Sequence, residues 1–301
     1  FGSHYVGYLT IHLDVQGGPA DAPAFLKVKM CEYHRELEED SADYKGWLGK
    51  GWLQEEWFHI DEFPAILQLP RRHALRYLKL EMLDTSPNFR VLVKQVMLDT
   101  VTAAPNKEVR PLDTDDALLK KIDEVSIRTL RDCMQDVFED GPKRDRRIWL
   151  GDFRLQAMVN AVTFQNFDLV KRCLYLFAGL IREDGAVGSC LYAEPRMIVD
   201  NIFLLDYSLF FVPTLLDYYH ATGDQETFKE LAPTAIRQLD AAKEYLQSDG
   251  IVEPEGRYSC FIDWKDGLHK QAAMHGVWLY SLRCCVQICR ALGENHLAEQ
   301  Y

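Results

Sequence analysis

The sequence reads Glu-Asp-Gly-Pro-Lys-Arg-Asp-Arg-Arg-Ile-Trp-Leu-Gly-Asp from residue 139 to residue 152. This segment holds four carboxylates and four lysine or arginine side chains, and two glycines and a proline interrupt it. Such a segment is expected to follow a turn-rich path, because Pro and Gly disfavour a regular helix. A charged run by itself is most often a solvated loop whose opposite charges pair weakly. The neighbouring segments therefore decide whether residues 139–152 form a polar site.

The chain after this segment has apolar residues at three- and four-residue spacing, which predicts α-helices. Short joins at 165–167 and 223–224 alternate with long joins at 182–201 and 247–270. This alternation predicts helical hairpins whose long loops emerge at one end, as in an α/α toroid, where such loops surround one cavity. The charged segment is itself one of these loops. The predicted helices span residues 153–163, 169–181, 204–222, 226–246 and 271–292.

One more helix is predicted before the charged segment. Residues 113–116, Asp-Thr-Asp-Asp, offer an N-cap and an acidic first turn. Residues 105–112 before them are polar, contain two prolines and show no period, so they are expected to be a linker. A single apolar stripe is expected to follow the cap, made of Leu118, Leu119, Ile122, Val125, Leu130, Cys133, Met134 and Val137.

The first hundred residues have a different period. Their apolar residues alternate or are rich in β-formers, with Pro and Gly between the runs, which is typical of antiparallel strands in a β-sandwich. The sequence thus predicts a β-sandwich domain at 1–104, a linker at 105–112 and a helical domain at 113–301. The predicted strands are 4–13, 25–30, 65–69, 75–82 and 89–93.

Composition limits the class of protein. With 301 residues, 48% of them hydrophobic, the chain can bury a large core and is long enough for about two domains. A net charge of -12 argues against a nucleic-acid partner, which needs a basic face. No apolar run approaches the roughly 20 residues that span a bilayer, so no membrane partner is expected. No His and carboxylate set has metal-ligand spacing, and no metal or other cofactor is predicted.

Eight cysteines are scattered through the chain without any C-x-x-C pair. They lie among apolar neighbours, which predicts buried free thiols. Free thiols favour a reducing cytoplasm over secretion. The first residues lack an initiator Met, so the native location is not read from them, and the oligomeric state is not readable either.

The order of residues within the charged segment is specific. Asp140, Pro142 and Arg144 precede Asp145, and a Gly-Asp pair ends at Asp152. This order and spacing resemble the acid-bearing motif of α-L-rhamnosidases, in which Asp-x-Pro-x-Arg precedes an acid and Gly-Asp closes the motif. Members of that family are inverting glycosidases with an (α/α)6 barrel. The strands upstream and the long loops downstream agree with the family's layout, so the resemblance spans nearly the whole chain.

The resemblance implies roles for four residues. Asp145 matches the position of the general acid, where many members have Glu, so the shorter Asp is a departure from the family's pattern. Asp140, Arg144 and Asp152 match positions that hold the hydroxyls of the sugar. This chemistry is reasonable, because a leaving glycosidic oxygen needs a carboxylic acid and crowded carboxylates resist ionising together. The implied substrate is a carbohydrate or glycoside with a terminal α-L-rhamnosyl residue, and no cofactor is implied.

Three further residues are weaker candidates for sugar binding. Trp149 is expected either to face the sugar or to anchor the loop in the core. Asp206 follows a long loop, where it either binds sugar or caps a helix. Trp264 lies in the other long loop, where family members often place an aromatic residue against the sugar's apolar face; its alternative is simple packing.

Inversion also needs a second carboxylate that activates water, about 6.5–9.5 Å from the acid. In the resembling family this base is a Glu in the last third of the barrel. About six helices are predicted here, whereas twelve would close the ring. The sequence is therefore expected to hold the first half of an (α/α)6-barrel catalytic domain, incomplete at its C-terminus, with the base beyond Tyr301.

Two alternatives stay open at this stage. One is a glycosidase with the same barrel and another sugar specificity. The other is a non-catalytic carbohydrate-binding protein, in which aromatic residues of the β-domain would form a stacking surface, although aromatic residues of a β-sandwich are usually core. The aromatic residues in question are Tyr5, Trp47, Trp52 and Trp57.

Overall fold

The structure is a computed structural model that describes residues 1–252 and 260–301. The chain divides into two compact units. Phe1–Thr102 and Gly141–Asp145 form the first unit, and Ala103–Asp140 and Arg146–Tyr301 form the second. A sheet-containing unit is thus followed by a helical one, as predicted. The sequence does not reveal that a short piece of the charged segment belongs with the first unit.

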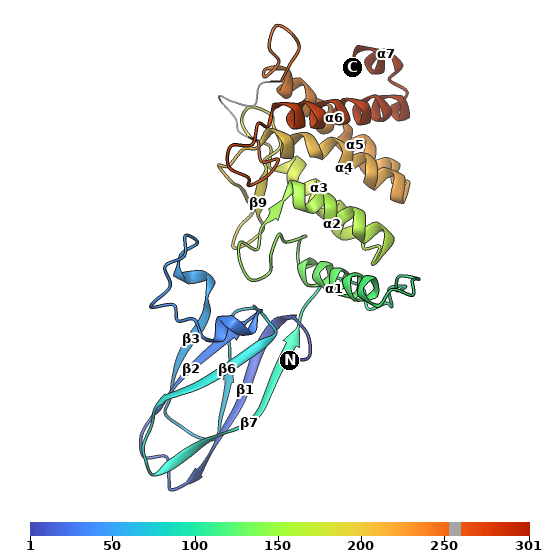
Figure 1. The fold of residues 1–301 in the computed structure, drawn as a ribbon. Helices are drawn as coiled ribbons and strands as arrows, with labels where there is room; N and C mark the ends of the chain where they lie inside the picture. Colours follow the sequence, from blue (N-terminus) through green and yellow to red (C-terminus); the bar gives the residue numbers. More distant parts are fainter. Residues whose placement is uncertain (253–259) are drawn as a thin grey trace. The chain divides into compact units, whose positions relative to one another are not determined.

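The first unit consists of antiparallel strands in two sheets. The strands are β1 (Tyr5–Gly17), β2 (Ala24–Cys31), β3 (Gln54–Ile60), β4 (Ala65–Gln68), β5 (His73–Leu75), β6 (Tyr77–Asp84) and β7 (Phe89–Thr100). One sheet has the order β4-β1-β5, with β7 also paired to β1, and the other has the order β3-β2-β6 (Figure 1). Alternate residues of β1 and β2, among them Leu9, Ile11 and Val28, share one buried apolar cluster. The alternation in the sequence follows from this burial of one face.

One predicted strand of this unit is wrong in its continuity. Residues 75–82 were expected to form a single strand, but the chain leaves one sheet after Leu75 and enters the other at Tyr77. Between them, the Arg76 N–H donates to the carbonyl of Cys31 at 2.8 Å. The apolar period is the same on both sides of Arg76, so the pattern does not record the change of sheet.

Strand β3 is absent from the prediction because two of its three buried residues, Gln54 and Glu55, are polar. The side-chain amide of Gln54 donates to the carbonyls of Met30 (3.1 Å) and Ala74 (2.7 Å) and accepts from the Ala74 N–H. The buried Glu55 carboxylate lies 3.3 Å from the Lys27 ammonium and 3.2 Å from that of Lys29. Polar groups that satisfy one another inside a protein conceal the hydrophobic alternation of their strand.

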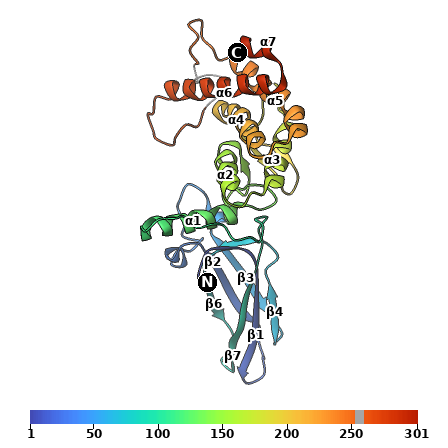
Figure 2. The same cartoon turned by 90° about the vertical axis from the view of Figure 1, so that its right-hand side faces the viewer.

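The second unit contains the helices and one small sheet. Its helices are α1 (Ala117–Cys133), α2 (Leu150–Val162), α3 (Phe167–Gly179), α4 (Leu205–Thr222), α5 (Gln225–Lys243), α6 (Gln271–Leu292) and α7 (Asn295–Gln300). All predicted helices are present, although α5 ends at Lys243 and not at residue 246. Helix α4 packs against α2, α3, α5 and α6, and the helices succeed one another along the unit (Figures 1 and 2). The three short strands of the sheet, which were not predicted, are β8 (Ile148–Trp149), β9 (Cys190–Tyr192) and β10 (Ile198–Val199).

Helix ends in this unit follow local chemistry. The Asp116 carboxylate accepts from the N–H groups of Leu118 (2.8 Å) and Leu119 (3.2 Å), which confirms the predicted cap. Gly223 and Gly293 end α4 and α6 with φ of 68° and 81°, a left-handed conformation that glycine adopts without strain. The predicted stripe of the first helix is too long, because α1 ends at Cys133. Met134 and Val137 are buried in the turns that follow it.

Aromatic rings and thiols form much of the helical core. Phe153 is fully buried, and its ring centroid lies 5.7 Å from that of Phe138 and 6.2 Å from that of Phe177. All eight cysteines are buried and free, which confirms that prediction. Among the helices of residues 1–252 and 260–301, none has the length and apolar character needed to cross a bilayer.

Truncation of Phe153 tests this core. Phe153→Ala should lower the free energy of unfolding by about 3–5 kcal/mol, because the cavity loses contacts with two other rings. Leu155→Ala, on the same helix but with 62% of its surface exposed, is the matched control and should change it by less than about 0.5 kcal/mol. Urea unfolding followed by circular dichroism measures both, and equal losses would contradict the core assignment.

Candidate active site

The three-stranded sheet joins two loops that are far apart in sequence. Ile148 pairs with Leu191, and Trp149 pairs with Cys190, in antiparallel register. The Leu150 N–H extends this pairing by donating to the carbonyl of Ser189 at 2.9 Å. The end of the charged segment therefore lies directly beside the long loop predicted at 182–201.

Asp140 and Arg147 close the charged segment into a loop. The Asp140 N–H donates to the Arg147 carbonyl at 2.9 Å, and the Arg147 N–H donates back to the Asp140 carboxylate at 3.2 Å. The Arg147 guanidinium donates to Asp200 at 2.9 Å and lies 4.6 Å from the ring centroid of Tyr192. Arg147 thus fixes both the charged loop and the neighbouring long loop. No role for Arg147 was predicted from the sequence, because its partner Asp200 lies 53 residues away.

Asp145 lies at a strained point of this loop. Asp145 and Arg146 have φ of 62° and 54°, in the left-handed region that costs a residue with a side chain roughly 1–2 kcal/mol. The Arg144 guanidinium pairs with the Asp145 carboxylate at 3.2 Å. Arg144 and Asp145 belong to Gly141–Asp145 of the first unit. Strain of this kind persists only where the surrounding structure enforces it.

Asp152 stands in the first turn of α2 beside Tyr207. The Tyr207 hydroxyl donates to the Asp152 carboxylate at 3.5 Å, the long limit for such a bond. Burial raises the pKa of Asp152 and also that of Tyr207. Gly151 makes this approach possible, since a Cβ at that position would lie 2.6 Å from Cζ of Tyr207. The Gly-Asp pair is thus explained by the ring that packs over it.

Four aromatic rings connect the candidate residues of the second unit. Trp149 meets Tyr207 edge to face at 6.1 Å, Tyr207 meets Phe261 at 5.9 Å, and Phe261 meets Trp264 at 5.2 Å. Such edge-to-face contacts are favourable for π-systems. Trp264 packs against Phe261 yet keeps 81% of its surface exposed. Its contact with sugar stays a prediction, as does that of Trp149.

Asp206 is buried, with 1% of its surface exposed. Its carboxylate accepts from the N–H groups of Phe261 (3.1 Å) and Ile262 (3.0 Å). Burial raises the pKa of this carboxyl, whereas these hydrogen bonds act against the rise. The alternative that Asp206 caps a helix is wrong, because Leu204 occupies the cap position of α4. Asp206 holds the second long loop, and its predicted sugar contact stays a prediction.

Two family models match the chain. Residues 1–100 match the glycosyl hydrolase family 78 α-rhamnosidase N-terminal domain. Residues 107–301 match the bacterial α-L-rhamnosidase 6 hairpin glycosidase domain. The chain belongs to the family 78 α-L-rhamnosidases. A search of curated proteins found no match.

Solved rhamnosidases share this fold. A rhamnosidase from Klebsiella oxytoca with rhamnose bound is 46% identical, with a TM-score of 0.96 over 100% of this chain and 58% of its own. A family 78 rhamnosidase of Bacillus sp. GL1 is 22% identical, with a TM-score of 0.76 over 99% of this chain and 30% of its own. A Streptomyces avermitilis α-L-rhamnosidase complexed with L-rhamnose is 18% identical, with a TM-score of 0.70 over 99% and 28%. The chain thus spans little more than half the length of the Klebsiella protein.

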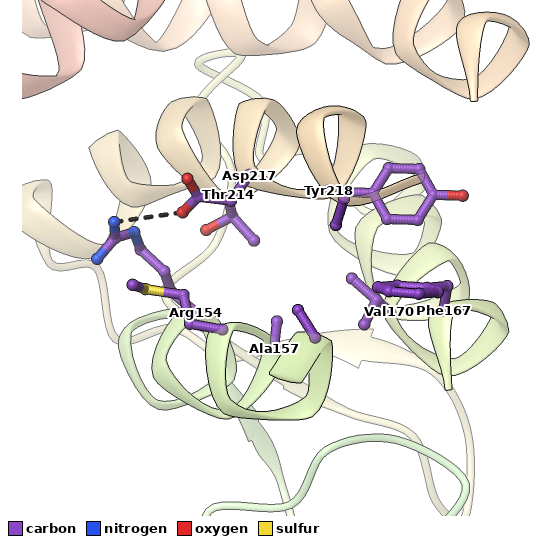
Figure 3. Close-up of a pocket in the computed structure, with 10 residues that line it drawn as sticks. Arg154, Ala157, Phe167, Val170, Thr214, Asp217 and Tyr218 are labelled. Carbon is purple, nitrogen blue, oxygen red and sulfur yellow. Dashed lines mark hydrogen bonds and ion pairs between the residues drawn. The ribbon is translucent and has the colours of Figure 1, made fainter. Parts of the chain in front are cut away.

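The second unit also has an apolar pocket between α2, α3 and α4 that the sequence did not indicate. Figure 3 shows Arg154 and Asp217 at one end, with Phe167, Val170 and Tyr218 at the other. Arg154 lies 3.3 Å from the Asp217 carboxylate and donates to the hydroxyl of Tyr280 at 3.0 Å. One guanidinium thereby connects helices α2, α4 and α6.

Across residues 1–252 and 260–301, no group of three His, Cys, Asp or Glu side chains is arranged to hold a metal ion. The carboxylates of the site instead meet backbone N–H groups, a tyrosine hydroxyl and arginine side chains.

The close approach of Gly151 to Tyr207 gives one testable prediction. Gly151→Ala should lower the free energy of unfolding by about 1–3 kcal/mol, since a methyl group forced against the buried ring must displace it. Gly276→Ala on α6 is the matched control, because no atom lies within 4 Å of its added Cβ. That change should be neutral or stabilising by up to about 1 kcal/mol. Denaturant unfolding compares the two, and equal effects would contradict the close approach.

A second prediction concerns the pKa of Asp152. Burial raises this pKa above the usual 3.8, so at pH values just above 3.8 the folded state binds the Asp152 proton more tightly than the unfolded chain does. The free energy of unfolding therefore falls as the pH rises through that window. Asp152→Asn removes this dependence, so the variant should gain stability relative to the wild type as the pH rises above the usual pKa of 3.8. Urea unfolding at about pH 4 and at about pH 7 measures the gain.

The control for this experiment is Asp115→Asn, which alters an exposed carboxylate of the same unit. Its difference from the wild type should stay constant across the pH range. A constant difference for Asp152→Asn as well would mean that Asp152 titrates normally in the folded protein.

Proposed function

We propose that the complete protein is a glycoside hydrolase that releases terminal α-L-rhamnosyl residues from glycosides or oligosaccharides with inversion. The observation that carries the proposal is the match, over the whole chain, to a 46% identical rhamnosidase that holds rhamnose. Membership of family 78 supports the same activity. The net charge of -12 suits a neutral sugar better than an anionic substrate.

Asp145 is the proposed general acid. Its proton passes to the glycosidic oxygen as the bond from that oxygen to the anomeric carbon breaks. With 17% of its side chain exposed, Asp145 is open to a ligand, and the Arg144 guanidinium at 3.2 Å orients it. Asp140, Arg144 and Asp152 are proposed to hold sugar hydroxyls. Asp140 also accepts a hydrogen bond from the Arg147 N–H, which closes the loop.

Aromatic residues are proposed to bind the apolar face of the sugar. Trp264 is the strongest of them, because its exposed indole rests edge to face on Phe261. Trp149 supports the site through its contact with Tyr207. For Asp206 we propose an indirect part, in which its carboxylate holds the backbone of the loop that carries Trp264.

The finer architecture is proposed in the same way. We infer a β-sandwich at 1–104, a linker at 105–112 and part of an (α/α)6 barrel at 113–301. The buried cluster shared by two sheets supports the sandwich, and the chain of contacts from α2 through α4 to α6 supports the barrel. The base that activates water is proposed to lie beyond Tyr301, and the 58% coverage of the Klebsiella chain supports this location.

The decisive experiment replaces the acid. Asp145→Asn in the complete protein should slow hydrolysis of an unactivated rhamnoside by about 10²–10⁴-fold, since the amide cannot protonate the leaving group. Asp43→Asn, an exposed carboxylate of the same unit, is the matched control and should hydrolyse it normally. Release of reducing sugar measures the rate, and circular dichroism checks folding. Normal turnover by Asp145→Asn would contradict the assignment of Asp145 as the general acid.

Specificity needs its own measurement. A panel of aryl glycosides that differ only in the sugar should yield the aryl alcohol fastest from the α-L-rhamnoside. Faster release from another sugar would favour the glycosidase of different specificity. No release from any sugar, together with retained sugar binding, would favour the non-catalytic carbohydrate-binding protein.

A further inference from the structure

Lys143 is a buried cation within the charged segment. Its side chain is 4% exposed. The ammonium lies 2.5 Å from the Glu36 carboxylate, 3.9 Å from that of Glu32 and 4.2 Å from the ring centroid of Trp52. Glu36 lies in the 3-10 helix His34–Leu37, and Trp52 ends the 3-10 helix Lys50–Trp52. All three partners belong to the first unit, together with Gly141–Asp145.

A solvated loop does not require such a site. Removing an ammonium from water is costly unless carboxylates and other groups replace its hydration. Here two carboxylates and the face of an indole ring surround Lys143, which is the environment that a buried lysine needs. The arrangement fixes one backbone position of the charged loop.

The fixed position is close to the proposed acid. Asp145 follows Lys143 by two residues, so their Cα atoms are separated by no more than about 7 Å. The two residues with left-handed backbone, Asp145 and Arg146, lie in the sequence between Lys143 and Arg147. A strained conformation needs constraints on both sides, and Lys143 supplies one while Arg147 supplies the other.

We propose that Lys143 is a positioning residue that holds Asp145 in the geometry needed for proton donation. This inference rests on the proposed function of Asp145. In the reaction the Asp145 carboxyl gives its proton to the leaving oxygen, which keeps the electron pair of the broken bond, while water adds to the anomeric carbon and loses a proton to the base. Lys143 exchanges no proton and touches no substrate.

A purely structural role is the rival explanation, and Lys27 provides the matched control for it. Its side chain is 6% exposed, its ammonium lies 2.6 Å from Asp40 and 3.3 Å from Glu55, and it stands over Trp57 at 5.1 Å. Lys27 therefore has the same burial and the same kinds of partner as Lys143. All of these partners belong to Phe1–Thr102 and none to the charged loop.

The test uses the complete protein and two rhamnosides that differ in their leaving group. A dinitrophenyl rhamnoside leaves as a stable phenolate and needs little protonation, whereas a methyl rhamnoside needs the acid. Lys143→Met should lower kcat for the methyl rhamnoside about 10–100-fold more than for the dinitrophenyl one, because the donor is displaced. Lys27→Met should change both rates by the same factor. Equal factors for Lys143→Met would overturn the inference while leaving the proposed function intact.

A second variant and a second measurement cover poor folding and absence of activity. Glu36→Gln keeps the shape of the partner and should give the same bias toward the dinitrophenyl substrate, in smaller degree. Amide hydrogen exchange of residues 140–147 should speed up in Lys143→Met and Glu36→Gln but not in Lys27→Met, whether or not the protein is active. Unchanged exchange would overturn the inference. A complete wild-type protein that hydrolyses neither rhamnoside would overturn the proposed function and, with it, the catalytic purpose of this positioning.

Discussion

The two hydrogen bonds between Asp140 and Arg147 are the constraint on which the candidate site depends. They force residues 141–146 to turn back within a short distance. They also deliver the chain at Ile148 in the direction needed to pair with β9. Helix α2 begins directly afterwards, so Asp152 in its first turn inherits a position set by this closure. A loop, a sheet and a helix start are therefore fixed by one local pair.

Two further carboxylates of the site fix its loops. Asp200 receives the guanidinium of Arg147, and Asp206 receives two N–H groups of the loop that leads to Trp264. Asp200 directly follows β10 and Asp206 lies in the first turn of α4, so the two acids stand on either side of the entry into this helix. Burial of Asp206 is tolerated because its oxygens are hydrogen-bonded. These acidic residues thus have a structural role, because each of them fixes part of a loop.

Local chemistry made much of the fold predictable from the sequence. The cap at Asp116, the glycines that end α4 and α6, and the change of apolar period each act over a few residues. Strand β3 was not predicted because Gln54 and Glu55 are polar and buried. The contacts that fix the loops of the site were not predicted for another reason, since the paired residues are distant in sequence. Glu36 is 107 residues from Lys143, and Phe261 is 55 from Asp206. Pairing over such separations leaves no period to read.

The membership of Gly141–Asp145 in the first unit has a consequence for the modularity of this protein. A cut in the linker at 105–112 looks natural from the sequence, yet it would leave Glu32, Glu36 and Trp52 without the cation that they surround. The excised helical part would in turn carry Lys143 as an unanchored loop residue. The sheet-containing unit is therefore no exchangeable accessory module, because its packing is completed by five residues encoded on the far side of the linker.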